Sequence, residues 1–466
     1  MHPHMHRTLL ACLVSTLAAH AQSTPDWPKV NTETLKHYQS VIRMDTTSGK
    51  ETQVAEYVKR VLDAEGIPAV IYEKEPGRGN LIARLKGNGS KRPLLIMGHS
   101  DTVKIDPAKW SHPAFSADLA DGYVYGRGTL DDKDNLTASL MTMILLKRSG
   151  IQLDRDVIFV SESGEEGQSS VGAGYLVAEH WPEIEAEICL AEGGSVIRRG
   201  GEVKYALIQT TEKIPRGAQL VAHGVAGHGS RPLRTNAILH LSRAVEKIAM
   251  WDPPMRFSDT TRYYFEKLAN LSAPEEAARY KALFDPAKSA AAREYLAEHE
   301  PGHYSMLHTS ISPNMITGGY QTNVIPSEAR ATLDVRALPD EDMPKFYELM
   351  RKVIDDPAVE VVPTNRISRD TAAPSRIDSE AWRVIEAANQ KIYRTPTLPQ
   401  MSTGATDMAY LRAKGVQCYG IGPMVDEEDG AKGFGAHSDQ ERLLEDALYK
   451  FVQFNWEVVT ALAAHK

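Results

Sequence analysis

The chain has 466 residues and a formal net charge of −8. This length exceeds what one ordinary hydrophobic core supports, so we expect two domains. The acidic balance and the lack of a block rich in lysine and arginine argue against nucleic acid or an anionic membrane as the main partner.

The first 21 residues have the features of a secretory signal peptide. Arg7 precedes a short apolar stretch at residues 8–19, and Ala19-His20-Ala21 fits an A-x-A cleavage site. The apolar stretch is too short to span a bilayer. We therefore expect export to the periplasm or the exterior, with no membrane contact after cleavage. A retained membrane anchor is the alternative.

Residues 22–210 alternate between apolar strands and amphipathic helices, which predicts an α/β domain with a mainly parallel sheet. Cys189 and Cys418 lie in strand-like runs, and we expect free buried thiols there, with a disulfide as the alternative. We expect helices at 31–65, with a break at 46–51, and at 135–147 and 170–181, and strands at 69–73, 80–87, 93–99, 156–163 and 186–193.

The pattern changes near residue 210, which predicts a small α+β domain at 211–366 inserted into the first domain. The catalytic, metal-binding domain would then comprise residues 22–210 and 367–466. Within the insertion we expect strands at 218–227, 327–338 and 359–364 and helices at 236–250, 258–300 and 341–354, and after it a strand at 416–423.

The first candidate metal ligand is His99, at the end of the strand predicted at 93–99. Side chains two residues apart in a strand lie on one face, so Asp101 would point the same way. We expect His99 to bind metal while Asp101 accepts its spare imidazole N–H and fixes the tautomer. A lone histidine at a strand end is more often a surface or core residue, so this assignment depends on the residues that follow.

Carboxylates supply the next candidates. Asp131 follows the motif GRGTL and would bridge two cations, although capping of the next helix is the alternative. Glu165 and Glu166 follow the strand at 156–163, at the end where open α/β sheets place their sites. We assign Glu166 as a metal ligand and Glu165 as the general base, and exposed surface charge is the alternative.

Glu192 ends the strand at 186–193, and His437 lies in a glycine-rich loop. The set of two imidazoles and three carboxylates suits two divalent cations with open positions for water and substrate. Zn²⁺ is the first choice, and Mn²⁺ or Co²⁺ would also suit these ligands. The predicted ligands are His99, Asp131, Glu166, Glu192 and His437.

With these residues in place, the chain resembles the dizinc exopeptidase family that includes glutamate carboxypeptidase, carboxypeptidase S, aminoacylase, carnosine dipeptidase and succinyl-diaminopimelate desuccinylase. The resemblance implies a zinc-exopeptidase-like mixed, mainly parallel sheet flanked by helices, with an inserted α+β lid that often dimerises. The matching motifs are GHSDTV, YGRGTLDDKDN, SGEEG, AEGG, AGHGSRPLRTNAI, NVIPSEARATLDVR and AHSDQE.

The resemblance also implies roles for three residues of the lid. His228 corresponds to a histidine that, in dimeric members, reaches the active site of the other subunit and polarises the scissile carbonyl. Asn323 and Arg336 correspond to positions that meet the substrate, and the planar fork of an arginine suits a terminal carboxylate. A turn histidine and an exposed strand arginine are the alternatives for His228 and Arg336. The segment 258–305 is longer than in compact lids and is similar to the carboxypeptidase S and N-acyl amino acid hydrolase branch.

The sequence therefore predicts an exported two-metal amidohydrolase that cleaves small peptides, in the manner of a carboxypeptidase or dipeptidase. An N-acyl amino acid deacylase of the same family is the alternative. A non-catalytic binding protein is more remote, because no ligand or base is missing. We expect a homodimer through the lid.

Overall fold

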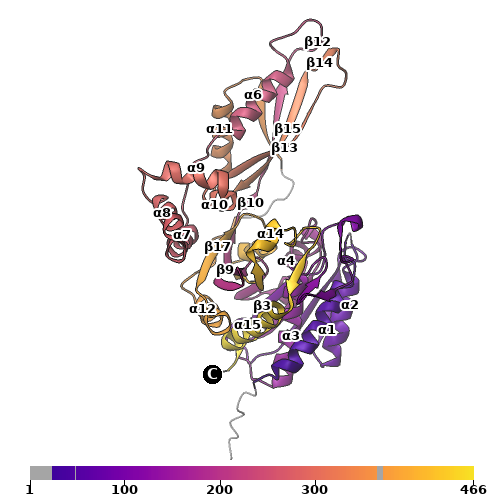
Figure 1. The fold of residues 1–466 in the computed structure, drawn as a ribbon. Coiled ribbons are helices and arrows are strands. Elements are labelled where there is room, and N and C mark those ends of the chain that lie inside the picture. Colours follow the sequence, from indigo (N-terminus) through magenta and orange to yellow (C-terminus); the bar gives the residue numbers. More distant parts are fainter. Residues whose placement is uncertain (1–23, 48, 365–370, 466) are drawn as a thin grey trace, which may run out of the picture.

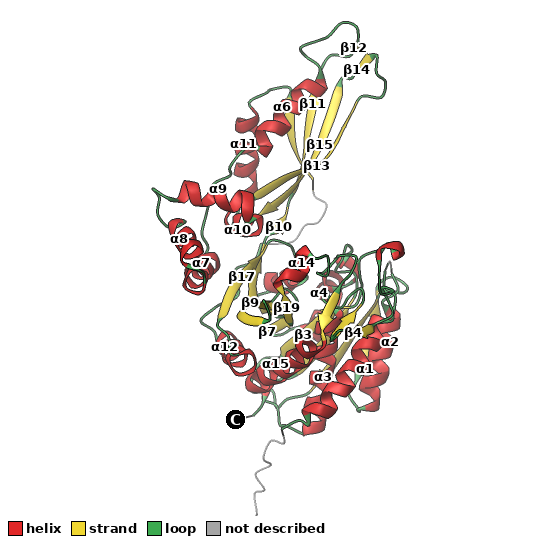
Figure 2. Cartoon of the chain, in the orientation of Figure 1, coloured by secondary structure: helices red, strands yellow, loops and turns green. Residues whose placement is uncertain are grey.

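The computed structural model describes residues 24–47, 49–364 and 371–465, so the predicted signal peptide at 1–21 lies outside the described residues. Figure 1 shows a broad α/β body and a narrower part that extends from it. Figure 2 shows the helices of the body packed around its strands. Within the described ranges, no helix combines the length and the apolar character needed to cross a bilayer.

A mixed sheet of ten strands forms the centre of the body in the described chain. Its order is β1-β2-β6-β3-β7-β18-β9-β8-β19, and β17 pairs with β9. The pairs of β3 with β6 and β7 are parallel, as is the pair of β7 with β18. The strands are β1 (Ala69–Glu73), β2 (Gly79–Leu85), β3 (Leu94–His99), β6 (Val157–Glu162), β7 (Ile188–Ala191), β8 (Ser195–Arg199), β9 (Glu202–Glu212), β17 (Thr397–Ser402), β18 (Gln417–Gly420) and β19 (Met424–Asp426).

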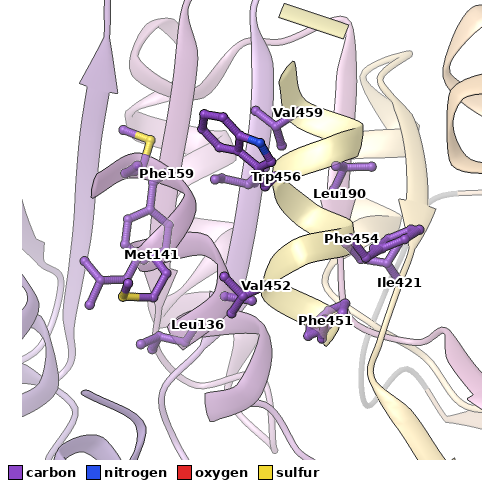
Figure 3. Packing of buried hydrophobic residues seen from close by; sticks show 14 of the residues in the cluster. Leu136, Met141, Phe159, Leu190, Ile421, Phe451, Val452, Phe454, Trp456 and Val459 are labelled. Atoms are coloured by element: carbon purple, nitrogen blue, oxygen red, sulfur yellow. The ribbon is translucent and has the colours of Figure 1, made fainter. Parts of the chain in front are cut away.

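Helices cover both faces of this sheet. Leu94 and Ile96 of β3 pack with α1, α2, α3, α12 and α15, whereas Leu95 and Met97 pack with α4, α5 and α13. Figure 3 shows α15, with Trp456, against the first face. Because both faces are buried, the central strands are apolar throughout. The helices are α1 (Trp27–Ile42), α2 (Thr52–Ala64), α3 (Lys133–Ser149), α4 (Ala173–Glu179), α5 (Trp181–Ile184), α12 (Glu380–Tyr393), α13 (Met408–Ala413) and α15 (Glu445–Ala463).

The extending part, which we call the lid, contains an antiparallel sheet with the order β10-β15-β11-β16, in which β13 also pairs with β15. Residues of β15 alternate between buried and partly exposed, because α6 and α11 cover one face. At the far tip, β12 pairs with β14 (Figure 1). These elements are β10 (Ile214–Pro215), β11 (Gly217–His223), β12 (Gly227–His228), α6 (Ala237–Ala249), β13 (Ser310–Gly318), β14 (Val324–Ile325), β15 (Glu328–Ala337), α11 (Met343–Ile354) and β16 (Val359–Thr364).

Four helices inside the predicted insertion share a core with the edge of the large sheet instead of with the lid sheet. Phe265 and Leu268 of the first of them share a core with Leu207, Leu398 and Met401 of β9 and β17. Within residues 214–364, the predicted insertion therefore contains an α+β lid and a helical segment that covers the edge of the large sheet. The helices are α7 (Asp259–Leu271), α8 (Pro274–Ala282), α9 (Ser289–His299) and α10 (Pro301–Leu307).

Two further features of the body matter below. Cys189 and Cys418 are neighbours in register on β7 and β18, and both are buried and free, as expected from the sequence. A small antiparallel sheet with the order β20-β5-β4 lies beside the large one. Its strands are β4 (Asp118–Ala120), β5 (Tyr123–Tyr125) and β20 (Arg442–Leu444), and the short helix α14 (Glu427–Ala431) precedes β20.

Candidate metal centre

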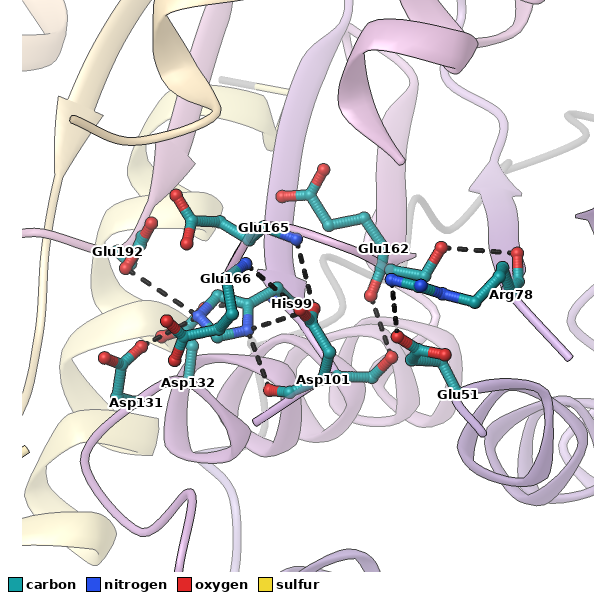
Figure 4. Close-up of polar contacts among 12 residues, drawn as sticks. Glu51, Arg78, His99, Asp101, Asp131, Asp132, Glu162, Glu165, Glu166 and Glu192 are labelled. Atoms are coloured by element: carbon teal, nitrogen blue, oxygen red, sulfur yellow. Dashed lines mark hydrogen bonds and ion pairs between the residues drawn. The ribbon is translucent and has the colours of Figure 1, made fainter. Parts of the chain in front are cut away.

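The predicted ligands gather at one edge of the large sheet. His99 is the last residue of β3, Glu192 follows β7, and Glu165 and Glu166 follow β6. Because β3 is parallel to β6 and to β7, the carboxyl ends of these strands meet at the same edge. Figure 4 shows the carboxylates arranged around His99. The polar side chains at the ends of these apolar strands therefore lie close together at one edge of the sheet.

Asp131 joins two groups of ligand atoms. His99, Asp131 and Glu192 form one group, and Asp131, Glu166 and His437 form the other; within each, the ligand atoms lie within 4.8 Å of one another. Nε2 of His99 lies 2.8 Å from Oδ1 of Asp131, and Nε2 of His437 lies 2.9 Å from Oδ2. The two oxygens of Asp131 therefore face different histidines, as a carboxylate that bridges two cations requires.

The remaining two carboxylates complete the two groups. Oε1 of Glu166 lies 2.8 Å from Nε2 of His437, and Oε2 of Glu192 lies 4.0 Å from Nε2 of His99. Each group therefore offers one imidazole, one carboxylate of its own and a share of Asp131. This is a donor set for two cations with positions left for water and substrate.

The histidines are strongly basic in this arrangement. Burial disfavours a charge on His99, but hydrogen bonds with Asp101 and Asp131 outweigh burial and raise its pKa well above the usual value. Hydrogen bonds with Asp131 and Glu166 raise the pKa of His437 to about 10. Protons on the two imidazoles thus offset part of the negative charge, and a bound cation would replace them.

Negative charge is still in excess at the centre. Burial, followed by the charge of Glu165, raises the pKa of Glu192 well above its usual range, and Asp132 and Asp131 add to the effect. Carboxylates crowded in this way favour a divalent counter-ion. The residues present therefore fit two divalent metal ions, both in donor type and in charge.

Asp101 fastens the loop that carries the two glutamates. Its Oδ1 and Oδ2 accept hydrogen bonds from the backbone N–H groups of Glu165 at 3.2 Å and Glu166 at 3.0 Å. Nδ1 of His99 lies 3.1 Å from the main-chain oxygen of Asp101 and 3.5 Å from its carboxylate. One buried residue thus touches both the imidazole and the loop, which is the geometry that an orienting role needs.

Residues that the sequence analysis did not identify also hold the centre together. Asp132 accepts a hydrogen bond from the backbone N–H of His99 at 3.1 Å and one from the side chain of Asn135 at 2.7 Å. Arg127 and Glu441 form a buried ion pair between the loops of Asp131 and His437. The signal for these residues was their place inside the motifs YGRGTLDDKDN and AHSDQE.

The three predicted lid residues lie away from the metal ligands of their own chain. His228 is on β12 at the outer tip of the lid (Figure 1), where the backbone N–H of Gly229 donates to the carbonyl of Asn323 at 2.7 Å. Both His228 and Asn323 are exposed. Arg336 is near the base of the lid, pairs in register with Pro215 and binds Asp334. The fold thus brings together the ligands and the base loop, but not the lid residues.

A model of peptidase family M20/M25/M40 matches residues 95–460. The chain belongs to this family. The resemblance seen in the sequence is therefore confirmed, as is the prediction of a hydrolase that acts on the C–N bonds of peptides or acyl amino acids.

Among curated proteins, the M20 chain is 24% identical to the N-fatty-acyl-amino acid synthase/hydrolase PM20D1 of Xenopus tropicalis, over 89% of this chain and 81% of that protein. It is 26% identical to the probable carboxypeptidase S-like 2 of Dictyostelium discoideum, over 82% of this chain and 74% of that protein.

Solved structures of the family share the fold. The M20 family metallo-carboxypeptidase of Sulfolobus solfataricus has a TM-score of 0.67 at 21% identity, with 92% of this chain and 99% of that chain covered. The YXEP protein of Bacillus subtilis, a dinuclear metal-binding peptidase, has a TM-score of 0.60 at 15% identity, with 93% and 99% covered. The predicted fold class, a mixed sheet flanked by helices with an inserted lid, is confirmed.

Proposed function

We propose that this chain is an exported two-metal amidohydrolase that cleaves small peptides beside a free carboxylate, as a carboxypeptidase or dipeptidase does. The observation that carries the proposal is the position of Asp131, whose two oxygens face His99 and His437 in two separate ligand groups. A shared carboxylate of this kind supports a pair of cations instead of one. Zn²⁺ is our choice of metal, because the ligands are imidazoles and carboxylates.

When bound, two divalent cations lower the pKa of a water molecule and polarise the scissile carbonyl. Glu165 accepts a proton from the attacking water and delivers it to the departing nitrogen. Its carboxylate is close enough to that of Glu192 to raise the pKa of Glu192, so it faces the metal-binding group (Figure 4). Asp101 holds the backbone of Glu165 and thereby keeps the base in place.

His228 acts on the substrate from a second subunit in this proposal. His228 and Asn323 lie together at the exposed lid tip, far from the ligands of their own chain (Figure 1). A homodimer through the lid would allow this tip to reach the partner's centre, where His228 would donate to the developing oxyanion. Arg336 would bind the free carboxylate of the substrate through its planar fork.

A second candidate function is hydrolysis of N-acyl amino acids. The curated relatives of Xenopus tropicalis and Homo sapiens are named N-fatty-acyl-amino acid synthase/hydrolase, at 24% and 26% identity. The same centre would serve both reactions, because each breaks an amide bond next to an amino acid carboxylate. Only the groups on either side of the bond differ.

A substrate panel tests the proposal. The protein lacking residues 1–21, loaded with Zn²⁺ and then treated with a chelator, would be assayed on dipeptides and on N-acyl amino acids. Cleavage of dipeptides that the chelator abolishes is the expected result. Cleavage of acyl amino acids alone would favour the second candidate. Metal-loaded protein that cleaves neither class would contradict both and favour a binding role.

A further inference from the structure

A cavity of about 310 Å³ lies beside the candidate metal centre. Three of its lining residues lie one or two positions from a predicted ligand in the sequence. Leu130 directly precedes Asp131, and Ala436 directly precedes His437. The third, Gly194, follows Glu192 by two residues. The cavity therefore shares its walls with the loops that carry three of the five ligands, from both ligand groups.

Two charged side chains of the wall, Arg198 and Asp426, bind each other. Nη2 of Arg198 binds Oδ2 of Asp426 at 2.7 Å, and the hydroxyl of Tyr123 donates to the same carboxylate at 2.6 Å. Another acidic residue of the wall, Glu427, accepts a hydrogen bond from Nη2 of Arg199 at 2.8 Å. These charges are therefore matched among themselves.

The second ion pair is held by aromatic rings. Arg442 binds Asp429 through two hydrogen bonds, of 2.9 and 2.7 Å. Its guanidinium lies 4.0 Å from the ring centroid of Tyr123 and 3.9 Å from that of Phe434. A sandwiched, bidentate arginine has little freedom to turn toward a ligand. Arg442 is therefore a fixed part of the cavity wall and is not placed to bind an anion.

The rest of the wall is apolar and includes Leu130, Pro423, Met424, Val425 and Leu443. A volume of about 310 Å³ leaves room for several water molecules. Displacement of such waters from apolar walls by an apolar group is favourable. With its charges paired and its lining apolar, the cavity suits an uncharged aliphatic or aromatic group.

We propose that this cavity is the specificity pocket that receives an apolar side chain next to the scissile amide, so that the preferred substrates carry leucine- or phenylalanine-sized groups there. The inference rests on the proposed amide hydrolysis, because the cavity can select substrates only if the metal centre beside it cleaves an amide bond. Val425, half-buried on the edge strand β19, is the wall residue that can be enlarged with the least disturbance of the core.

The first experiment measures kcat/KM for Gly-X and X-Gly dipeptides, with X as Gly, Ala, Leu or Phe. Zn²⁺-loaded wild type, Val425→Phe and Val425→Ala would be compared, with Val362→Phe on the exposed face of β16 as the matched control. We expect wild type to prefer Leu or Phe in one position by roughly 10-fold or more. In Val425→Phe, kcat/KM should fall more on the Leu and Phe substrates than on the glycine substrate, so that the preference is lost, while Val425→Ala should shift the preference toward Phe.

An equal loss on every substrate in Val425→Phe, or no preference for apolar groups in wild type, would overturn the pocket while leaving the proposed hydrolysis intact. If wild type cleaves no substrate, the proposed hydrolysis is contradicted, and the pocket is then tested by binding. Calorimetry would measure the binding of N-acetyl-leucine and of N-acetylglycine to Zn²⁺-loaded Glu165→Gln protein, with and without Val425→Phe. Preference for N-acetyl-leucine that Val425→Phe removes supports the pocket, and equal or absent binding refutes it.

Discussion

Arg127 and Glu441 form a buried ion pair, with Nη1 of the arginine 2.5 Å from Oε2 of the glutamate, across 314 residues of sequence. The arginine side chain is 2% exposed and that of the glutamate 0%. Oε1 of Glu441 also accepts from the backbone N–H of Leu130 at 2.7 Å, and Arg127 donates to the carbonyl of Ser438 at 2.9 Å. The pair thus ties the residue before Asp131 to the residue after His437.

This relationship predicts that Glu441 positions the metal ligands. Glu441→Gln leaves the volume unchanged but removes the charge that holds Arg127, so the loops of Asp131 and His437 should loosen relative to each other. We expect Zn²⁺ affinity to fall about 10- to 100-fold, the range typical for residues that support metal ligands. Calorimetric Zn²⁺ titration measures this loss, and the visible spectrum of Co²⁺-loaded protein should change as well.

The control for this variant is Glu360→Gln, which removes an exposed carboxylate from the lid strand β16. Its metal affinity and Co²⁺ spectrum should match those of wild type. Glu441→Gln with unaltered affinity and spectrum would show that the ion pair does not position the ligands.

The adjacent residues Glu165 and Glu166 should respond differently to the same substitution. Glu165→Gln removes the proposed base, so we expect kcat to fall by about 10²- to 10⁴-fold while two metal ions stay bound. Glu166→Gln removes an oxygen donor near His437, so metal content should fall together with activity. Elemental analysis beside steady-state kinetics separates the two. Near-normal turnover by Glu165→Gln would rule out the base assignment.

The sequence was sufficient to predict where most of the candidate ligands would meet. Apolar runs that end in His99, Glu165–Glu166 and Glu192 become the parallel strands β3, β6 and β7, whose ends share one sheet edge. Because strand periodicity and burial are local properties, they can be read from short stretches. The position of Glu441 against Arg127 depends on the packing of loops 314 residues apart, which no local pattern contains.

Two features of the fold were also out of reach from local patterns. β13 was not predicted, because its residues are mostly exposed and include Pro313, so they show no clean alternation. The helices at 258–300 were expected, but their docking was not, since an amphipathic face shows only that a helix is covered and not by what. In the structure, Leu398 and Met401 of β17 provide that cover.

Protein stability should depend on pH through His308, which lies between α10 and β13. Its side chain is 0% exposed, and burial lowers its pKa below the usual value, although Nδ1 lies 2.7 Å from the carbonyl of Tyr304. A histidine in an unfolded chain has a pKa of about 6.5. Below that pH, the unfolded state binds a proton that the buried side chain of the native state does not bind. Stability is therefore lost as pH falls through about 6.5.

Replacement of His308 by asparagine removes this titration and keeps a donor for the carbonyl of Tyr304. The variant should be less stable than wild type at pH 7.5, because packing is lost. Its free energy of unfolding should then fall less steeply toward pH 5.5, by at most about 1.4 kcal/mol per pH unit. Urea unfolding of the metal-free proteins at pH 7.5, 6.5 and 5.5 provides the comparison, and parallel pH profiles would exclude His308 as the cause.

The lid tip leads to the last prediction, that His228 acts in the active site of a partner subunit. Co-expression of His228→Ala and Glu165→Gln chains with different tags gives a mixture in which half of the dimers are mixed. One site of each mixed dimer then combines an intact Glu165 with an intact His228 from the other chain. Activity should recover to about one quarter of wild type, since one site in two is restored in half of the dimers.

The two variants alone are the controls, and both should be nearly inactive. Sedimentation of the mixture shows whether dimers form at all. If His228 instead acted within its own chain, every site in the mixture would lack one of the two groups, and activity would stay at the level of the controls. The exposed position of His228 on β12, away from the ligands at the ends of β3, β6 and β7, is the reason to expect recovery.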